Sequence, residues 1–325
     1  GGYTGGPAKV AVIASALMGT IHGSGPGNVA TTGTFTIPLM KRLGYKPYFA
    51  GAVEAAASTG GIIMPPVMGA TAFIIAEMTG IPYSRIALAA VIPAFLYFYS
   101  IFCIVHLEAI KENLSGVPES ELPDKKELMK EIYLFSPIIA IIVFLIMGSS
   151  PMKAGFYGIV VTIIVSCFKK DTRLNFKRFI TALEGGSSEV VSICLACGTA
   201  GIIAGIISLT GLGVKMSYVI STISQGQLIP ALIMTMIVCI ILGMGMPVTA
   251  AYILVAATTT TILTKMGLNT LTSAFFMFFY ATLSAVTPPV ALSSYTAAGI
   301  AGADMNKTGF EAVKLCLAAF IIPFM

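Results

Sequence analysis

The sequence contains unusually little charge. Only 10% of its 325 residues are Asp, Glu, Lys or Arg, and Trp is absent, whereas soluble domains carry about 25% charged residues. Hydrophobic residues make up 56%, and the mean hydropathy is +0.92. This composition excludes a soluble globule, whose surface would need more charge, and an intrinsically disordered chain, which would be rich in charge. We therefore predict an all-α polytopic membrane protein.

The apolar segments fall into two length classes. A spanning helix needs about 20 apolar residues, and segments of roughly that length occur at about 88–110, 132–148, 153–168, 187–209 and 309–325. Shorter apolar segments occur as adjacent pairs. Segments 7–21 and 29–43 flank a Gly-rich tip at 22–28, and segments 229–242 and 249–264 flank a second tip at 243–248. We predict that each pair forms a re-entrant helical hairpin.

Each predicted hairpin is followed by an apolar segment that contains two adjacent prolines. Segment 47–79 is interrupted at Pro65-Pro66, and segment 271–299 at Pro288-Pro289. A proline inside a helix removes a backbone donor and breaks the helix. A hairpin followed by a broken helix thus occurs twice in the chain, which indicates an internal repeat. Such paired interrupted segments are typical of a transporter's binding site.

Positive charge is distributed unevenly between the loops. The net charge of +5 does not indicate nucleic-acid binding, because most Lys and Arg residues lie in short loops at 41–46, 111–130 and 169–178. Basic loops mark the cytoplasmic side of a membrane protein. This rule predicts a cytoplasmic linker at 111–131. It also places the two hairpins with opposite orientations, so the repeats are predicted to be inverted.

The breaks suggest binding of a cation together with an anion. Backbone groups stranded in a bilayer are tolerated where a cavity or ligand satisfies them. Helix N-termini at the tips favour an anionic group. No Lys or Arg lies deep in the membrane, so dipoles, hydroxyls and Asn28 would hold a carboxylate. The neutral oxygens expected to hold a cation such as sodium are the carbonyls near Ser58, Thr59, Gly60, Ser284 and Thr287 and the hydroxyls of Ser24, Thr31, Thr32, Thr249 and Thr287.

Two ionisable residues near the first hairpin can each be interpreted in two ways. Glu54 lies within the first broken helix, and an acid at membrane depth is a functional candidate. It is either the carrier of a proton or an acid near the interface that reaches water or pairs with Lys46. His22 at the first tip either titrates near neutral pH or serves as a hydrogen-bonded structural group.

Four segments resemble the large membrane subunit of tripartite ATP-independent periplasmic (TRAP) transporters. They are 14–45 (ASALMGTIHGSGPGNVATTGTFTIPLMKRLGY), 55–67 (AAASTGGIIMPPV), 242–254 (LGMGMPVTAAYIL) and 287–301 (TPPVALSSYTAAGIA). The chain has Asn28 where the family pattern is acidic, and Pro247 where many members carry Asp. The second tip is similar to fused permeases that work with TAXI-type binding proteins.

The resemblance implies an elevator-type secondary transporter of the bacterial or archaeal inner membrane. It would take up a small organic anion such as a C4-dicarboxylate by sodium or proton symport. The anion would come from a periplasmic TAXI-type binding protein, and a small membrane subunit or its fused equivalent would complete the permease. Sodium is the only cofactor implied. The implied cation ligands are Ser24, Gly25, Asn28, Thr59, Gly60, Gly243, Gly245, Thr249, Ser284 and Thr287. The expected substrate contacts are Asn28, Thr31, Thr32, Pro66, Thr249 and Pro289, with Glu54 as the proton-coupling candidate.

The predicted organisation has four parts. Residues 1–80 and 229–302 form the transport domain, 81–228 form the scaffold with the linker, and 303–325 form a truncated C-terminal helix. We expect a fragment that lacks the small-subunit helices and the first helices of the large subunit. A stand-alone dicarboxylate carrier of the elevator type is the alternative. An intramembrane enzyme would need a catalytic pair that the sequence lacks, and a channel would need a repeated filter.

Overall fold

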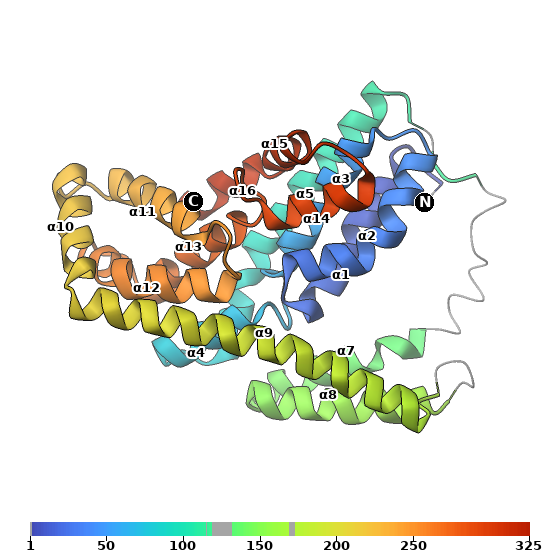
Figure 1. The fold of residues 1–325 in the computed structure, drawn as a ribbon, viewed down its shortest axis with the longest axis horizontal. Helices are drawn as coiled ribbons and strands as arrows, with labels where there is room; N and C mark the ends of the chain where they lie inside the picture. The colour runs from blue at the N-terminus through green and yellow to red at the C-terminus, as the bar shows by residue number, and fades with distance from the viewer. Residues whose placement is uncertain (1, 115, 119–131, 169–172) are drawn as a thin grey trace.

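The computed structural model describes residues 2–114, 116–118, 132–168 and 173–325. These residues form helices, and no strand occurs among them (Figure 1). The helices are arranged around one main hydrophobic core, in which α3 and α13 are almost completely buried. The architecture agrees with the predicted all-α membrane protein.

The first predicted hairpin consists of α1 (Gly6–His22) and α2 (Gly25–Arg42). Its tip contains only Gly23 and Ser24, so it is shorter than the predicted tip at 22–28. Gly23 has a positive φ of 65° and ends α1, which is a conformation that glycine adopts without a steric penalty. Ser24 caps α2 by accepting a hydrogen bond from the N–H of Gly27 at 3.3 Å.

The second predicted hairpin consists of α11 (Leu228–Gly243) and α12 (Val248–Lys265). Its tip covers 244–247, and the turn depends on Gly245, which has a φ of 76°. Both hairpins therefore lie where the paired short segments predicted them.

Each broken segment forms two helices with the double proline between them. The first gives α3 (Pro47–Gly61) and α4 (Ala70–Thr79), and the second gives α13 (Thr270–Leu283) and α14 (Leu292–Ala301). Both Pro-Pro bonds are cis. A tyrosine hydroxyl donates to the last proline carbonyl in each break, Tyr83 to Pro66 at 2.9 Å and Tyr295 to Pro289 at 2.6 Å.

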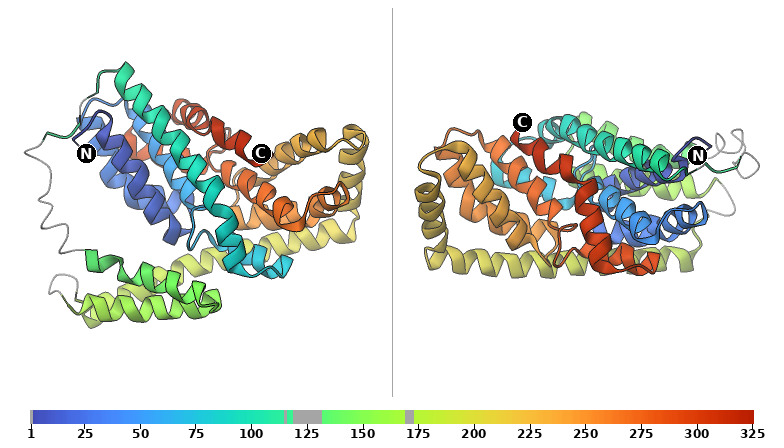
Figure 2. Two further views of the ribbon diagram at one scale, coloured as in Figure 1. Left: turned by 180° about the vertical axis from the view of Figure 1, so that it is seen from behind. Right: turned by 90° about the horizontal axis from the view of Figure 1, so that it is seen from above.

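The halves of the chain are interleaved at these breaks. Helix α14 packs against α2 and α3 of the first half, whereas α4 packs against α12 and α13 of the second half. Figure 2 shows the blue and red helices side by side from two directions. The two tips and the two breaks consequently meet in the middle of the molecule.

The segment between the two halves is also helical. It contains α5 (Tyr83–Lys111), η2 (Ile132–Phe135), α7 (Ser136–Ile146), α8 (Pro151–Ser166), α9 (Phe176–Leu209) and α10 (Leu212–Ser224). Helices α7 and α8 pack mainly on each other, and α9 packs along α12. Helices α5 and α9 both begin earlier than the predicted segments 88–110 and 187–209. The predicted cytoplasmic linker 111–131 lies mostly outside the described residues.

The predicted single helix over 309–325 is divided in the structure. Helix α15 (Met305–Leu315) ends before Cys316, and α16 (Leu317–Ile321) and η3 (Ile322–Phe324) follow. Two features favour the change from α16 to η3. Pro323 lacks an N–H and cannot extend a helical hydrogen-bond ladder, and the carbonyl of Phe320 accepts a hydrogen bond from Tyr280 at 2.7 Å.

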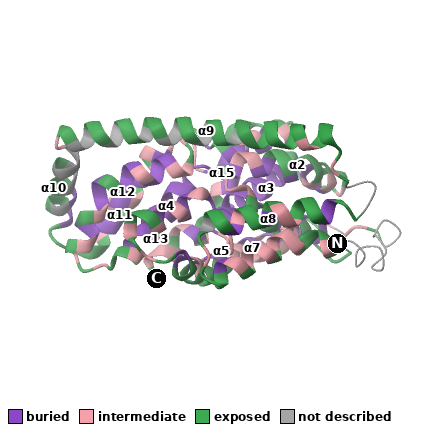
Figure 3. Cartoon of the chain, turned by 90° about the horizontal axis from the view of Figure 1, so that it is seen from below, coloured by how far each residue is buried: buried purple, intermediate pink, exposed green. Residues whose placement is uncertain are grey.

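Much of the surface of the described residues is apolar. In the described part of the chain, Tyr83–Lys111 and Val248–Lys265 are long and apolar enough to cross a membrane. Exposed apolar side chains recur at helical spacing on α1 at Val10, Ile13, Leu17 and Ile21. Figure 3 shows the exposed surface extending along α9 and α8. Such a surface is expected of a protein surrounded by lipid or by further membrane helices.

Charged side chains pair at the ends of helices. Lys46 precedes α3 and contacts Glu112, which follows α5, at 2.8 Å. The hydrogen bond from Lys46 lowers the pKa of Glu112 below its ordinary value. Lys46 is therefore occupied by Glu112, so the predicted alternative in which it pairs with Glu54 is wrong.

Candidate functional site

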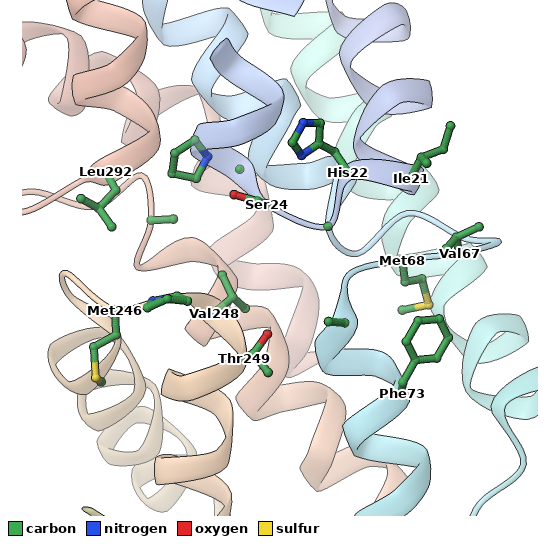
Figure 4. A pocket seen from close by; sticks show the side chains of 16 residues that line it. Ile21, His22, Ser24, Val67, Met68, Phe73, Met246, Val248, Thr249 and Leu292 are labelled. Atoms are coloured by element: carbon green, nitrogen blue, oxygen red, sulfur yellow. The ribbon is translucent and has the colours of Figure 1, made fainter. Parts of the chain in front are cut away.

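A cavity of about 370 Å³ lies between the two hairpin tips (Figure 4). Ser24 and Thr249 enter it from opposite tips, while Met68 and Phe73 approach from the first break and α4. The remaining lining residues are Ile21, His22, Gly23, Gly25, Pro26, Val67, Ala70, Met246, Pro247, Val248, Ala285 and Leu292. This volume is at the lower end of the range for small-molecule sites.

Four helices begin at the wall of this cavity. The lining includes the first residues of α2, α4, α12 and α14, which are Gly25, Ala70, Val248 and Leu292. Helices α4, α12 and α14 have no side chain that caps their N-termini. Since the first N–H groups of a helix lack intrahelical partners and carry partial positive charge, the cavity suits an anionic ligand.

Formal charge is absent from the residues that line the cavity. No Lys, Arg, Asp or Glu is among them, and His22 is the one titratable residue. Its Nε2 lies 3.3 Å from the hydroxyl of Thr31. The cavity therefore offers backbone dipoles, two hydroxyls and apolar contacts, and it has no ion pair for a carboxylate.

Three buried oxygen atoms near the first tip have no hydrogen-bond partner. They are Asn28 Oδ1, Thr59 Oγ1 and Ser293 Oγ, and all three residues are fully buried. The hydroxyls of Thr59 and Ser293 both face Gly25, where an added Cβ would lie 3.3 Å and 2.5 Å from them. Asn28 belongs to the first turn of the same helix α2. Unpaired buried oxygens are costly unless a ligand satisfies them, and neutral oxygens suit a hard cation.

Glu54 is fully buried within a cage of hydroxyl groups. Its Oε1 accepts hydrogen bonds from Ser15 at 2.6 Å, Thr32 at 2.5 Å and Ser58 at 2.8 Å, and its Oε2 accepts one from Thr36 at 2.5 Å. The donors come from α1, α2 and α3. The acid therefore fastens the first hairpin to the first broken helix.

Two hydroxyls of the predicted second group of cation ligands donate hydrogen bonds to the backbone. The hydroxyls of Ser284 and Thr287 donate to backbone carbonyls at 2.7 Å and 2.8 Å. Gly243 permits a close approach, since an added Cβ would lie 2.4 Å from Ser284 Oγ. Gly245 adopts the positive φ of the turn, and the hydroxyl oxygens of Thr249 and Thr71 lie 3.2 Å apart. Among the described residues at this second tip, no buried side-chain oxygen lacks a hydrogen-bond partner, in contrast to the first tip.

The carbonyls predicted to be free at the first break also have partners. The carbonyl oxygens of Thr59 and Gly60 accept turn hydrogen bonds from Ile62 and Ile63 at 3.2 Å and 3.1 Å. Gly60 has a packing role, because an added Cβ would lie 2.1 Å from the Tyr97 ring. The hydroxyl of Thr59, rather than the backbone, is the unpaired group here.

The predicted substrate residues separate into two sets. Thr249 lines the cavity, whereas Thr31 lies on an exposed face of α2 and Thr32 is directed to Glu54. Pro66 and Pro289 present their carbonyls to tyrosines and do not line the cavity.

Several residues of the site have no distinctive signal in the sequence. Ser293 lies in the second broken segment but faces the first tip, because α14 crosses to the first hairpin. Ser15 and Thr36 contact Glu54 from the outer parts of the hairpin arms, at helical spacing from the tip. That spacing is the one sequence signal for them, and it does not distinguish them from ordinary packing residues.

Comparison with known proteins identifies the family. The family described as "Tripartite ATP-independent periplasmic transporter, DctM component" matches residues 1–325. The chain belongs to this family. Its members are transporter permeases of the inner membrane, in agreement with the predictions of a TRAP large subunit and of a protein that is not an enzyme.

The chain is similar to several TRAP permeases. It is 24% identical to the isethionate TRAP transporter permease protein DctMQ of Oleidesulfovibrio alaskensis, over 99% of this chain and 51% of that protein. It is 23% identical to the C4-dicarboxylate large permease protein DctM of Pseudomonas aeruginosa, over 95% and 72%. It is 22% identical to the 2,3-diketo-L-gulonate large permease protein YiaN of Escherichia coli, over 88% and 67%. The chain thus spans about half the length of its DctMQ relative.

Proposed function

We propose that this chain is the transport part of a permease that takes up a small organic anion by cation symport. The anion, a carboxylate or a chemically related acid, occupies the cavity between the two tips. The observation that carries the proposal is this cavity, where four helix N-termini meet and no charged Lys or Arg lines the wall. Relatives named for isethionate, C4-dicarboxylates and 2,3-diketo-L-gulonate support an organic acid.

The coupling ion of this proposal is sodium, held at the first tip. The unpaired oxygens of Asn28, Thr59 and Ser293 fit a cation that takes neutral oxygen ligands. A cation there would offset the charge of an anion in the neighbouring cavity, whose wall includes Gly25. Cation and anion would then stabilise each other's binding, as symport requires.

The alternative coupling ion, in place of sodium, is a proton carried by Glu54. Two of the hydroxyls that face its carboxyl group also have backbone acceptors one turn earlier in α2. Thr32 lies 2.8 Å from the carbonyl of Asn28, and Thr36 lies 3.1 Å from that of Thr32. The cage therefore has hydrogen-bond partners for both the charged and the neutral carboxyl group, so Glu54 would carry the proton.

The proposed transport cycle is of the elevator type. The two units of hairpin and broken helix are proposed as inverted repeats that form the moving transport domain, residues 1–80 and 229–302. Residues 81–228 would provide the scaffold. A periplasmic TAXI-type binding protein would deliver the anion, and a small subunit or its fused equivalent would complete the permease. The matching order of elements and the uneven loop charge support this arrangement.

Uptake into proteoliposomes tests the proposal. The full-length permease and its binding protein would be supplied with radiolabelled isethionate, succinate and 2,3-diketo-L-gulonate in turn. Inward gradients of sodium and of protons would be imposed separately. We expect one of the three acids to accumulate under the sodium gradient when its binding protein is present. The proton arm tests Glu54 as the carrier.

Three outcomes would contradict parts of this proposal. Accumulation under the proton gradient alone would exclude sodium as the coupling ion. Equal accumulation without the binding protein would favour the stand-alone dicarboxylate carrier. Failure of all three acids to accumulate under either gradient would refute organic-anion symport.

A further inference from the structure

We propose that Glu54 is a charged positioning residue of the sodium site, acting through Ser58 on Asn28. The inference rests on the proposed function, which supplies the sodium ion. It adds a role for Glu54 and for the hydroxyl groups around it. Glu54 itself does not contact the three unpaired oxygens. It sets the orientation of one ligand and the electrostatic potential at the site.

A short chain of hydrogen bonds connects the carboxyl group to Asn28. Glu54 Oε1 accepts from Ser58 Oγ at 2.8 Å, and Ser58 Oγ accepts from Asn28 Nδ2 at 3.1 Å. Asn28 Nδ2 also donates to the carbonyl of Ser15 at 2.8 Å, while the hydroxyl of Ser15 donates to Glu54 at 2.6 Å. Two paths therefore lead from one carboxyl group to one amide.

These contacts determine which way the Asn28 side chain points. With both donor contacts of Nδ2 made to Ser15 and Ser58, the oxygen Oδ1 lies on the opposite side of the amide, where it has no partner. Without the cage, the amide is free to turn and to present its N–H₂ group, which repels a cation. Glu54 thus keeps the acceptor atom available.

The carboxyl group also lacks a counter-ion inside the protein. Glu54 is completely buried, and among the described residues no Lys, Arg or His forms a salt bridge with it. The nearest lysine to its helix, Lys46, pairs with Glu112 instead. A buried carboxylate whose partners are all neutral hydroxyls attracts a nearby cation strongly, because the protein interior screens charge less than water. The three ligands are neutral, so Glu54 is the source of negative charge.

Three variants separate charge from structure. Glu54→Gln keeps the size and removes the charge, whereas Glu54→Asp keeps the charge and shortens the side chain. Ser58→Ala removes one path to Asn28. Thr34→Val is the matched control, since it removes a hydroxyl of the same helix α2 that donates to the carbonyl of Thr31 and does not contact Glu54.

Sodium affinity is measured without transport. The full-length protein in detergent would be titrated with sodium chloride against potassium chloride, with thermal unfolding as the readout. An ion that binds the folded state stabilises it by RT ln(1 + [L]/Kd), so the rise in unfolding temperature reports the dissociation constant. Equilibrium binding of radioactive sodium would give the same constant directly. We expect Glu54→Gln to weaken sodium binding by about tenfold or more. Glu54→Asp and Thr34→Val should stay closer to the wild-type sodium affinity, and the affinity of Ser58→Ala should lie between theirs and that of Glu54→Gln.

The outcomes distinguish this inference from the proposed function. If wild type binds sodium and Glu54→Gln binds it equally well, the role of Glu54 is refuted while sodium coupling stands. A greater loss of sodium affinity in Glu54→Asp than in Glu54→Gln would show that Glu54 has a purely structural role, and it would also refute the inference. If wild type does not respond to sodium at all, the sodium site itself is refuted, and the role of Glu54 with it. Should Glu54→Gln fail to fold in detergent, the sodium affinities of Ser58→Ala and Thr34→Val decide, since equal affinities would overturn the inference.

Discussion

Substituting Gly25 by alanine should selectively weaken the proposed sodium site. The added Cβ would lie 2.5 Å from Ser293 Oγ and 3.3 Å from Thr59 Oγ1. An ordinary contact is longer than about 3.5 Å, so the Ser293 hydroxyl must move by about 1 Å. This exceeds the tolerance of about 0.2 Å within which metal–ligand distances vary. Alanine forms helices better than glycine, so α2 should persist.

The expected loss of sodium affinity follows from the loss of one oxygen ligand. Leaving a buried polar group unsatisfied costs about 1–3 kcal/mol, which corresponds to an affinity loss of about 5- to 150-fold. We expect a decrease in this range for Gly25→Ala in a sodium titration of thermal stability. Ser293→Ala should cause a similar loss by itself. The double variant should be no worse than Ser293→Ala, because the collision and the ligand are then both gone.

The double-mutant cycle makes the reasoning refutable. Effects of the two substitutions that add independently would show that Gly25 and Ser293 do not share one site. Wild-type sodium affinity in Gly25→Ala would show that the space between the two hydroxyls is unrelated to sodium binding. Either result would remove the geometric basis of the proposed site.

Further substitutions test other parts of the account. Thr249→Val and Ser24→Ala should each reduce sodium-dependent uptake in proteoliposomes while membrane insertion is preserved, and wild-type uptake in both would contradict their assignment to the cavity. Gly60→Ala should destabilise the fold by about 3 kcal/mol or more, because its Cβ would lie 2.1 Å from the Tyr97 ring. Gly155→Ala is the matched control, since nothing lies within 4 Å of its added Cβ. Equal unfolding temperatures of the two variants in detergent would refute this packing role.

The hairpins and breaks could be predicted because their signals are local. Glycine and proline interrupt apolar periodicity at Gly23 and at Pro65-Pro66. Helix α1 ends directly before Gly23, and α3 ends at Gly61, shortly before the double proline. The helix bounds were less predictable. Helix α2 begins at Gly25 because Ser24 caps it, so the first tip is shorter than its Gly-rich sequence suggests.

The site could be predicted only in part, because it depends on how the two halves interleave. The predicted residues Asn28 and Thr59 are buried beside the first tip, but their partner Ser293 comes from α14 of the second half. No spacing in the sequence relates Ser293 to Gly25. The hydroxyls around Glu54 likewise come from three helices, so their convergence depends on helix packing and not on a motif.

Equilibrium binding of radioactive sodium to the full-length protein tests the proposed sodium site without the need for transport. We expect saturable binding by wild type in the presence of excess potassium. We also expect Gly25→Ala and Ser293→Ala each to lose affinity, while Thr34→Val retains it. Absence of saturable binding by wild type, or equal binding by wild type, Gly25→Ala and Ser293→Ala, would contradict a sodium site at the first hairpin tip.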